Sequence, residues 1–164
     1  VSREAIRILR LFGDTETHRI ITCVGAEQEY FLLPKDLYAQ REDLRLTGRT
    51  LFGAAAPKGQ ELDDHYFAAI RTRVSEFMQD LDEQLWRLGI LSKTKHNEGA
   101  PCQHELAPIY TDANKACDDN QLIMRTMKKQ NEHDDPSLET AVFLIKSSYN
   151  AAALIDSRRK QKSR

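Results

Sequence analysis

The sequence has 164 residues, of which 40% are hydrophobic and 30% charged, so its length fits one domain and wholesale disorder is excluded. No run of about 18 apolar residues occurs, which excludes a membrane-spanning helix. Lys and Arg number 24 against 25 Asp and Glu, but residues 157–164 carry five basic side chains and no acidic one. The rest of the chain therefore has a net charge of −6. An acidic body with a short basic tail is not typical of a nucleic-acid binder.

The first 62 residues predict a helix, a β region and a long connection. Apolar residues at helical spacing follow a cap at Ser2 and end before Gly13. Residues 19–33 are rich in β-branched and aromatic side chains and predict one long strand or two short ones, ended by Pro34. Residues 34–62 show no sustained period, and a connection of that length is usually functional or dependent on a partner.

Helical periodicity returns in the second half of the chain. The clearest run has apolar residues in steps of three and four, with Asp63 or Asp64 as its cap and Gly89 as its stop. Two further runs follow, the last with Pro136 near its start. The three predicted helices cover residues 64–88, 112–129 and 138–155.

The three cysteines are too few and too scattered for a disulfide framework. Cys23, Cys102 and Cys117 form no CxxC pair, and any disulfide would leave one of them over. No signal-peptide pattern is visible in the sequence. We therefore expect a reducing, cytoplasmic compartment.

Two glutamates in the β region are the first candidates for chemistry. Side chains alternate along a strand, so Glu27 and Glu29 are expected on one face, about 6.6–6.8 Å apart. The other face would be apolar, with Val24, Ala26, Tyr30 and Leu32. Carboxylates cost free energy when they are buried without a partner. On spacing alone, a solvated face and a functional site both remain open.

A predicted hairpin holds a second pair of glutamates. Two strand-like runs, 91–98 and 102–110, flank Gly99-Ala100-Pro101. If the runs pair, Glu98 and Glu105 could lie directly opposite each other, with Cβ atoms about 4.5–5.5 Å apart. Two carboxylates that close repel each other unless a cation lies between them.

Together the four glutamates make an oxygen-rich cluster, which suits Mg²⁺ or Mn²⁺ better than Zn²⁺ because hard cations prefer carboxylates and water. His96 and His104 are near in sequence but lack the i, i+4 spacing of a helical zinc pair. Taken singly, such histidines are more often structural or exposed than ligands. The residues alone predict a divalent-metal site on a sheet, formed by Glu27, Glu29, Glu98 and Glu105.

Six segments, in this order, also carry a family likeness: LRLFGDTE from Leu9, VGAEQEYFL from Val24, LTGRTLFGA from Leu46, PKGQELDDHYF from Pro57, HNE at His96 and QHELAPI from Gln103. Across residues 9–129 the chain resembles glutamine synthetase of the type III class. LTGRTLFGA and KGQELDDHYF resemble this class rather than the shorter bacterial and eukaryotic ones.

The resemblance implies ATP-dependent ligation of ammonia to L-glutamate through γ-glutamyl phosphate, with Mg²⁺ or Mn²⁺ as cofactor. It also implies an α+β fold, in which an incomplete antiparallel sheet of the glutamine synthetase catalytic domain is backed by amphipathic helices. By motif, Glu29, Glu98 and Glu105 would hold the metal that orients the substrate glutamate. Glu27 would serve a second metal at the phosphates. Family members form rings with sites between subunits, so the expected partners are further copies or full-length synthetase.

The chain departs from the family pattern in several places. Gly99 stands where valine usually follows HNE, and Cys102 stands where a small residue such as alanine is common. The family pattern would continue with a glycine-rich segment, a ligand histidine, phosphate-binding arginines and a last ligand glutamate. Residues 130–164 contain no glycine and match none of these. We therefore expect residues 1–129 to be a partial catalytic domain and residues 130–164 a divergent helix and basic tail.

Two functions remain open from the sequence. The first is a synthetase domain that cannot complete the reaction alone, because losing several transition-state contacts costs many orders of magnitude in rate. The second is a non-catalytic interaction subunit, or degenerate paralogue, that associates with full-length synthetase. Binding of nucleic acid through the basic tail is a weaker alternative, and no membrane partner is expected. With part of the sheet missing, we also expect exposed edges and marginal stability.

Overall fold

The computed structural model describes residues 1–55, 59–130, 140–146 and 154–156. Helices and strands mix along the chain in the order α1 (Ser2–Leu11), β1 (Ile21–Val24), β2 (Gln28–Pro34), α2 (Lys35–Ala39), α3 (Glu42–Thr47), a 3₁₀ turn (Glu61–Asp63), α4 (Thr72–Arg87), β3 (Ser92–Asn97), β4 (Gln103–Pro108), β5 (Thr111–Asp112), α5 (Ala113–Gln130), β6 (Thr140–Lys146) and β7 (Leu154–Asp156).

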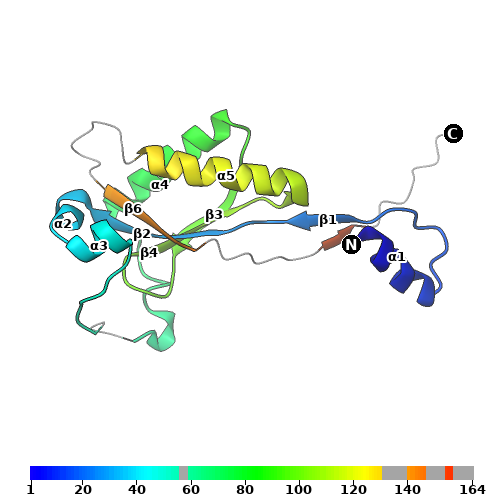
Figure 1. The fold of residues 1–164 in the computed structure, drawn as a ribbon, viewed down its shortest axis with the longest axis horizontal. Coiled ribbons are helices and arrows are strands. Elements are labelled where there is room, and N and C mark those ends of the chain that lie inside the picture. Colours follow the sequence, from blue (N-terminus) through cyan, green and yellow to red (C-terminus); the bar gives the residue numbers. More distant parts are fainter. Residues whose placement is uncertain (56–58, 131–139, 147–153, 157–164) are drawn as a thin grey trace.

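The strands form two small antiparallel sheets. The larger has the order β3-β4-β2-β6 and the smaller the order β5-β1-β7. Helices α4 and α5 lie on one side of the four-stranded sheet, whereas α1 lies beyond β1 at the far end of the molecule (Figure 1). This arrangement confirms the predicted α+β class.

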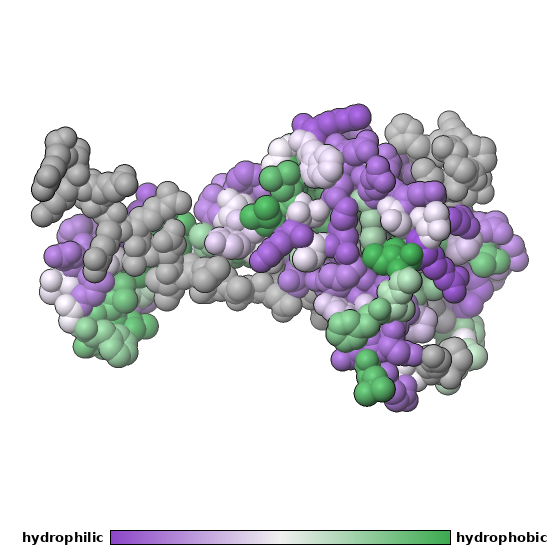
Figure 2. All heavy atoms as spheres, turned by 180° about the vertical axis from the view of Figure 1, so that it is seen from behind, coloured by the Kyte–Doolittle hydropathy of each residue, from purple (hydrophilic) through white to green (hydrophobic). Residues whose placement is uncertain are grey.

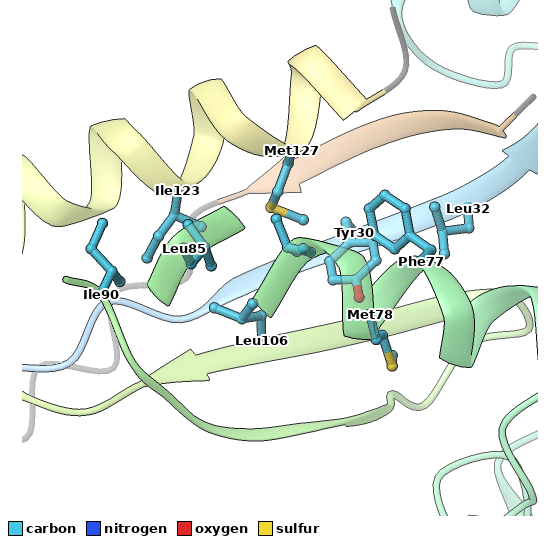
Figure 3. Packing of buried hydrophobic residues seen from close by; sticks show 10 residues of the cluster. Tyr30, Leu32, Phe77, Met78, Leu85, Ile90, Leu106, Ile123 and Met127 are labelled. Carbon is cyan, nitrogen blue, oxygen red and sulfur yellow. The ribbon is translucent and has the colours of Figure 1, made fainter. Parts of the chain in front are cut away.

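The main core lies between the four-stranded sheet and these two helices. It contains ten buried residues: Tyr30, Leu32, Phe77, Met78, Leu81, Leu85, Ile90, Leu106, Ile123 and Met127 (Figure 3). Alternate residues of β2 and residues three or four apart on α4 point into it, as the two periodicities predict. Each fully buried large aliphatic side chain contributes about 1.5–3 kcal/mol. The core therefore fixes which face of β2 and β4 meets the helices, and leaves the other face for Glu29 and Glu105.

Buried polar contacts tie the helices to the sheet. Asp82 of α4 is 6% exposed, pairs with Lys95 of β3 and accepts a 2.6 Å hydrogen bond from the Ser92 hydroxyl. Gln28 of β2 donates a hydrogen bond to the side-chain oxygen of Asn120 on α5. Because unpaired buried charge is costly, the Asp82 pair holds β3 in one position against α4.

The connection after β2 is more ordered than its sequence predicts. It contains α2 and α3, and the Asp43 carboxylate at the start of α3 organises the loop that follows. Asp43 accepts hydrogen bonds from the Leu51 and Phe52 amides at 3.0 and 3.4 Å and forms an ion pair with Arg41 at 2.6 Å. The Arg41 guanidinium, together with these amides, holds the pKa of Asp43 well below its usual range.

Several predicted elements are confirmed. Residues 19–33 form two strands, β1 and β2, rather than one. The two runs after Gly89 form the β3–β4 hairpin, and the helix predicted over 112–129 is α5. The first helix is α1, which ends at Leu11, but the predicted cap at Ser2 is wrong: Val1 is the N-cap, and the Ser2 hydroxyl accepts a hydrogen bond from the Ile20 amide.

Two predicted helices are wrong in part. The helix expected over 64–88 begins only at Thr72, because the preceding residues turn back over the β3–β4 hairpin, where Ala68 accepts a 3.0 Å hydrogen bond from Asn97. The described parts of 138–155 are strands, and β6 pairs with β2. The basic tail at 157–164 lies outside the described residues, and a division of the chain at residue 129 remains a prediction.

Candidate metal centre

Three side chains form a row across neighbouring strands of the larger sheet. Glu29 of β2 lies directly opposite Glu105 of β4, and Glu105 lies directly opposite His96 of β3. Because side chains alternate, Tyr30 and Leu106 point to the other side, into the core. We call the side that carries Glu29, Glu105 and His96 the glutamate face.

Glu98 reaches the same face from two residues after His96, just past the end of β3 at Asn97. The prediction that it lies directly opposite Glu105 is wrong, because the hairpin closes earlier. The Glu98 amide donates to the carbonyl of Gln103 at 2.9 Å, so residues 99–102 make the turn, with Cys102 at a φ of 62°. Glu98 is therefore a diagonal neighbour of Glu105, still within reach of it.

Glu27 precedes β2 instead of lying within it, so the prediction of two glutamates on one strand holds only for Glu29. The charge of Glu27 nevertheless acts on Glu105. The pKa of Glu105 is raised to about 8, first because burial penalises its charged form and then because other carboxylates surround it. Those carboxylates belong to Glu27, Glu98 and Glu29. The fold thus brings the other three glutamates singled out from the sequence around Glu105, which is 8% exposed.

Gln103 positions one of these carboxylates and was not identified from the sequence. Its side-chain nitrogen donates to Glu29 Oε2 at 2.7 Å, while its side-chain oxygen accepts from the Ala100 amide at 3.1 Å. The turn of the hairpin is thereby connected to the carboxylate on β2. The QHE sequence could have indicated this contact, because Gln103 and Glu105 are two residues apart on β4 and must share a face.

The segment around the 3₁₀ turn closes one side of the centre. The Tyr66 ring lies 4.9 Å from the His96 ring between centroids, and His65 donates a hydrogen bond from Nδ1 to the carbonyl of Glu98. Figure 1 shows this segment on the side of the sheet away from α4 and α5. Periodicity alone assigned these residues to a helix and so missed their contacts with the site.

The two histidines of the hairpin have different surroundings. His104 is buried on the core side, donates from Nδ1 to the Asn97 side-chain oxygen at 3.0 Å, and has its pKa lowered to about 4, by burial first and then by His65. His104 is therefore a neutral structural histidine, the role expected more often than that of a metal ligand. His96 is on the glutamate face, 3.5 Å from Glu98 Oε1 and 3.6 Å from Glu105 Oε1.

The donor set fits a divalent cation. His96, Glu98 and Glu105 can each offer one ligand atom such that all three atoms lie within 4.8 Å of one another. Glu29 stands beside them, directly across from Glu105. Clustered carboxylates repel one another and so destabilise the metal-free site. A hard cation removes this repulsion because it binds to their oxygens. The geometry is that of an oxygen-rich centre on an open sheet.

Comparison with known proteins identifies the family. Residues 5–153 match the model of the glutamine synthetase catalytic domain, and the chain belongs to the glutamine synthetase family. It is 59% identical over 129 residues to a glutamine synthetase of Butyrivibrio fibrisolvens and 44% identical over 128 residues to a type-3 glutamine synthetase of Dictyostelium discoideum. These alignments cover 79% and 78% of this chain but 18% and 17% of the relatives, so the chain spans less than a fifth of their length. The resemblance to the type III class is confirmed.

A solved structure shows the same fold. The cryo-EM structure of Plasmodium falciparum glutamine synthetase superposes with a TM-score of 0.51 at 17% sequence identity. The match covers 85% of this chain and 29% of the Plasmodium chain. Among the described residues, no helix is both long and apolar enough to cross a membrane.

Proposed function

We propose that the chain serves the ATP-dependent ligation of ammonia to L-glutamate through γ-glutamyl phosphate, as the part of a catalytic domain that holds a divalent cation. The observation that carries this proposal is the convergence of Glu27, Glu29 and Glu98 on Glu105 within a domain of this family. The cation is Mg²⁺ or Mn²⁺, and ATP is a substrate. The three cysteines are free thiols, which fits the cytoplasmic setting that we propose.

Each glutamate has a separate role in this proposal. Glu29, Glu98 and Glu105 hold the cation that orients the substrate glutamate, and Glu27 serves a second cation at the ATP phosphates. When bound, such cations offset the repulsion between phosphate and carboxylate charges. Gln103 keeps the Glu29 carboxylate in place through its 2.7 Å hydrogen bond. Glu105 gives up its proton when a cation binds, because the cation replaces the proton as counter-charge.

We expect the 164-residue chain not to complete the reaction by itself. The phosphate-binding arginines and the further ligands that the resemblance implies have no counterpart in its sequence. Transition-state contacts act together, so removing several of them lowers the rate far more than removing one.

Ligand-observed NMR tests the proposal without requiring turnover. Saturation transfer from the chain to L-glutamate is expected in Mg²⁺, with a weaker signal from D-glutamate, and it should disappear in the Glu29→Gln variant. Glu83→Gln, a change at an exposed position on α4, serves as the matched control and should retain the signal. Equal signals from L- and D-glutamate, or signals independent of Mg²⁺, would contradict the proposal.

The second candidate is a non-catalytic subunit that associates with full-length synthetase or with further copies of this chain. Large apolar side chains that are strongly exposed favour it, among them Phe52 at 79% and Phe67 at 77%. Apolar regions also stand out on the face seen in Figure 2. Co-purification of the tagged chain with a full-length synthetase, reduced by Phe52→Ser, would support this candidate. Glutamine formation by the isolated chain would eliminate it.

A further inference from the structure

His96 occupies a place on the glutamate face that the four-carboxylate account leaves unexplained. Its two ring nitrogens face two different carboxylates, with Nδ1 3.5 Å from Glu98 Oε1 and Nε2 3.6 Å from Glu105 Oε1. These separations exceed a normal hydrogen bond. The His96 side chain is 25% exposed, so it is mostly enclosed by protein.

The hydrogen bond of the other ring atom indicates the state of Nε2. Nδ1 lies 2.9 Å from the Asn97 carbonyl oxygen, and a carbonyl can only accept, so Nδ1 carries the proton. In the neutral ring Nε2 then carries a lone pair, and that lone pair faces the Glu105 carboxylate. Once Glu105 has given up its proton, these two acceptors repel each other unless a positive charge lies between them.

The ring is also held as a metal ligand would be. Histidines that bind metals nearly always donate their other ring N–H to a carbonyl, carboxylate or water, which fixes the ring and its tautomer. The Asn97 carbonyl fills that role, and Tyr66 packs against the ring with centroids 4.9 Å apart. Two oxygens at about 2.0–2.1 Å from an octahedral cation lie about 3 Å apart when adjacent and about 4 Å apart when opposite. The 3.6 Å between His96 Nε2 and Glu105 Oε1 matches neither value, so the two atoms would have to approach each other by about 0.6 Å for adjacent coordination.

We propose that Nε2 of His96 is a nitrogen ligand to the cation held by Glu98 and Glu105, and that this ligand makes the site prefer Mn²⁺ to Mg²⁺. The inference rests on the proposed function, since it assumes that the glutamates bind a cation. Carboxylates and water suit both ions, whereas imidazole is a poor ligand for Mg²⁺ and a better one for transition metals. One nitrogen among oxygens therefore strengthens Mn²⁺ binding and leaves Mg²⁺ binding nearly unchanged.

A protonated His96 is the competing explanation, because an imidazolium would also relieve the repulsion. The two explanations predict opposite effects of removing the ring. If His96 is a ligand, the variant binds Mn²⁺ less tightly. If His96 is a resident cation, the variant binds both metals more tightly, since a like charge has been removed from the site.

Calorimetry on the 164-residue chain separates these cases. In the His96→Gln variant, the Mn²⁺ dissociation constant should rise at least about tenfold, the loss that even an outer-shell partner causes, while that for Mg²⁺ should change less than about twofold. His18→Gln, at an exposed position between α1 and β1, is the matched control and should leave both constants unchanged. An unchanged ratio of the two constants, or tighter binding of both metals, would overturn the inference.

Pulsed electron paramagnetic resonance of bound Mn²⁺ gives a second readout that needs no variant. The wild-type chain labelled with ¹⁵N-histidine should show a ¹⁵N coupling to Mn²⁺ in place of the ¹⁴N coupling of the unlabelled chain. Tight Mn²⁺ binding without histidine coupling would overturn the inference and leave the proposed function standing. Failure of the wild-type chain to bind either metal, or binding that Glu105→Gln does not weaken, would overturn both.

Discussion

The position, burial and pKa of Glu105 together describe the environment of the glutamate face. Glu105 lies between Glu29 and His96 across the sheet, is nearly buried, and has its pKa raised to about 8 by burial and by the carboxylates around it. A fold that only needed stability would gain from an apolar side chain at this position. Packing therefore does not account for the cluster, which is why we propose a cation there.

Glu98 provides a test at the scale of one residue. Saturating Mn²⁺ should raise the melting temperature of the wild-type chain, since a ligand at 100 times its dissociation constant adds about 2.7 kcal/mol to the free energy of unfolding. Glu98→Gln should remove most of this shift, although Glu98 is diagonal rather than opposite to Glu105. Differential scanning fluorimetry with and without Mn²⁺ measures it, and Glu83→Gln should behave as wild type. A full shift in the Glu98 variant would exclude Glu98 from the site.

Asp43 gives a prediction about pH away from the glutamate face. Its pKa is lowered, so its contribution to stability is present above the pKa of an unfolded aspartate, about 3.9, and is lost as the pH falls through the folded-state pKa. The Leu51 and Phe52 amide resonances should therefore titrate well below pH 3.9 in an NMR series. Arg41→Ala should move the midpoint upward, because it removes the ion pair. A wild-type midpoint near 3.9 would contradict this account.

Helix α4 illustrates which elements could be predicted from sequence. Its apolar periodicity correctly identified the buried face, and the alternation along β2 correctly separated Tyr30 from Glu29. Residues 64–70 continue the same periodicity but pack over the hairpin as turns, because contacts with His104, Asn97 and Glu98 outweigh local propensity. Residues 140–146 form a strand, which their run of β-branched and aromatic residues would have favoured over a helix.

The hairpin register shows the limit of pattern reasoning for the site. Sequence alone identified the four glutamates and the pairing of the two runs. It could not fix where the turn closes, and so placed Glu98 opposite Glu105 when His96 is there. A shift of two residues keeps every side chain on its face. The predicted acidic residues therefore lie together despite the incorrect register, and their role as metal ligands stays a prediction. Sequence reasoning assigned His96 no place in the site.

Leu81 tests the role of α4 in supporting the sheet. It is 0% exposed in the core, so Leu81→Ala should lower the free energy of unfolding by about 2–5 kcal/mol through lost burial and a cavity. Leu122→Ala on α5 alters a side chain that is 38% exposed and should cost much less. Urea denaturation followed by circular dichroism measures both. Equal losses in the two variants would show that the core does not lie where the structure places it.

At the scale of the whole molecule, a small core supports the glutamate face in a chain that spans less than a fifth of the length of its relatives. The chain covers 18% of the length of a relative that is 59% identical to it, yet the sheet still brings Glu27, Glu29 and Glu98 together around Glu105. Strands β3 and β6 are the two ends of the described four-stranded sheet. We infer that the arrangement of the metal centre depends mainly on local pairing of β2, β3 and β4.

Mn²⁺ calorimetry on the 164-residue chain and on its Glu29→Ala and Glu105→Ala variants tests this claim most directly. These residues come from strands far apart in sequence and meet only through the β2–β4 register. We predict that wild type binds Mn²⁺ and that each single substitution abolishes the binding while circular dichroism shows a folded chain. Absence of binding in folded wild type, or binding that either variant retains at full strength, would show that the glutamates do not form one metal centre.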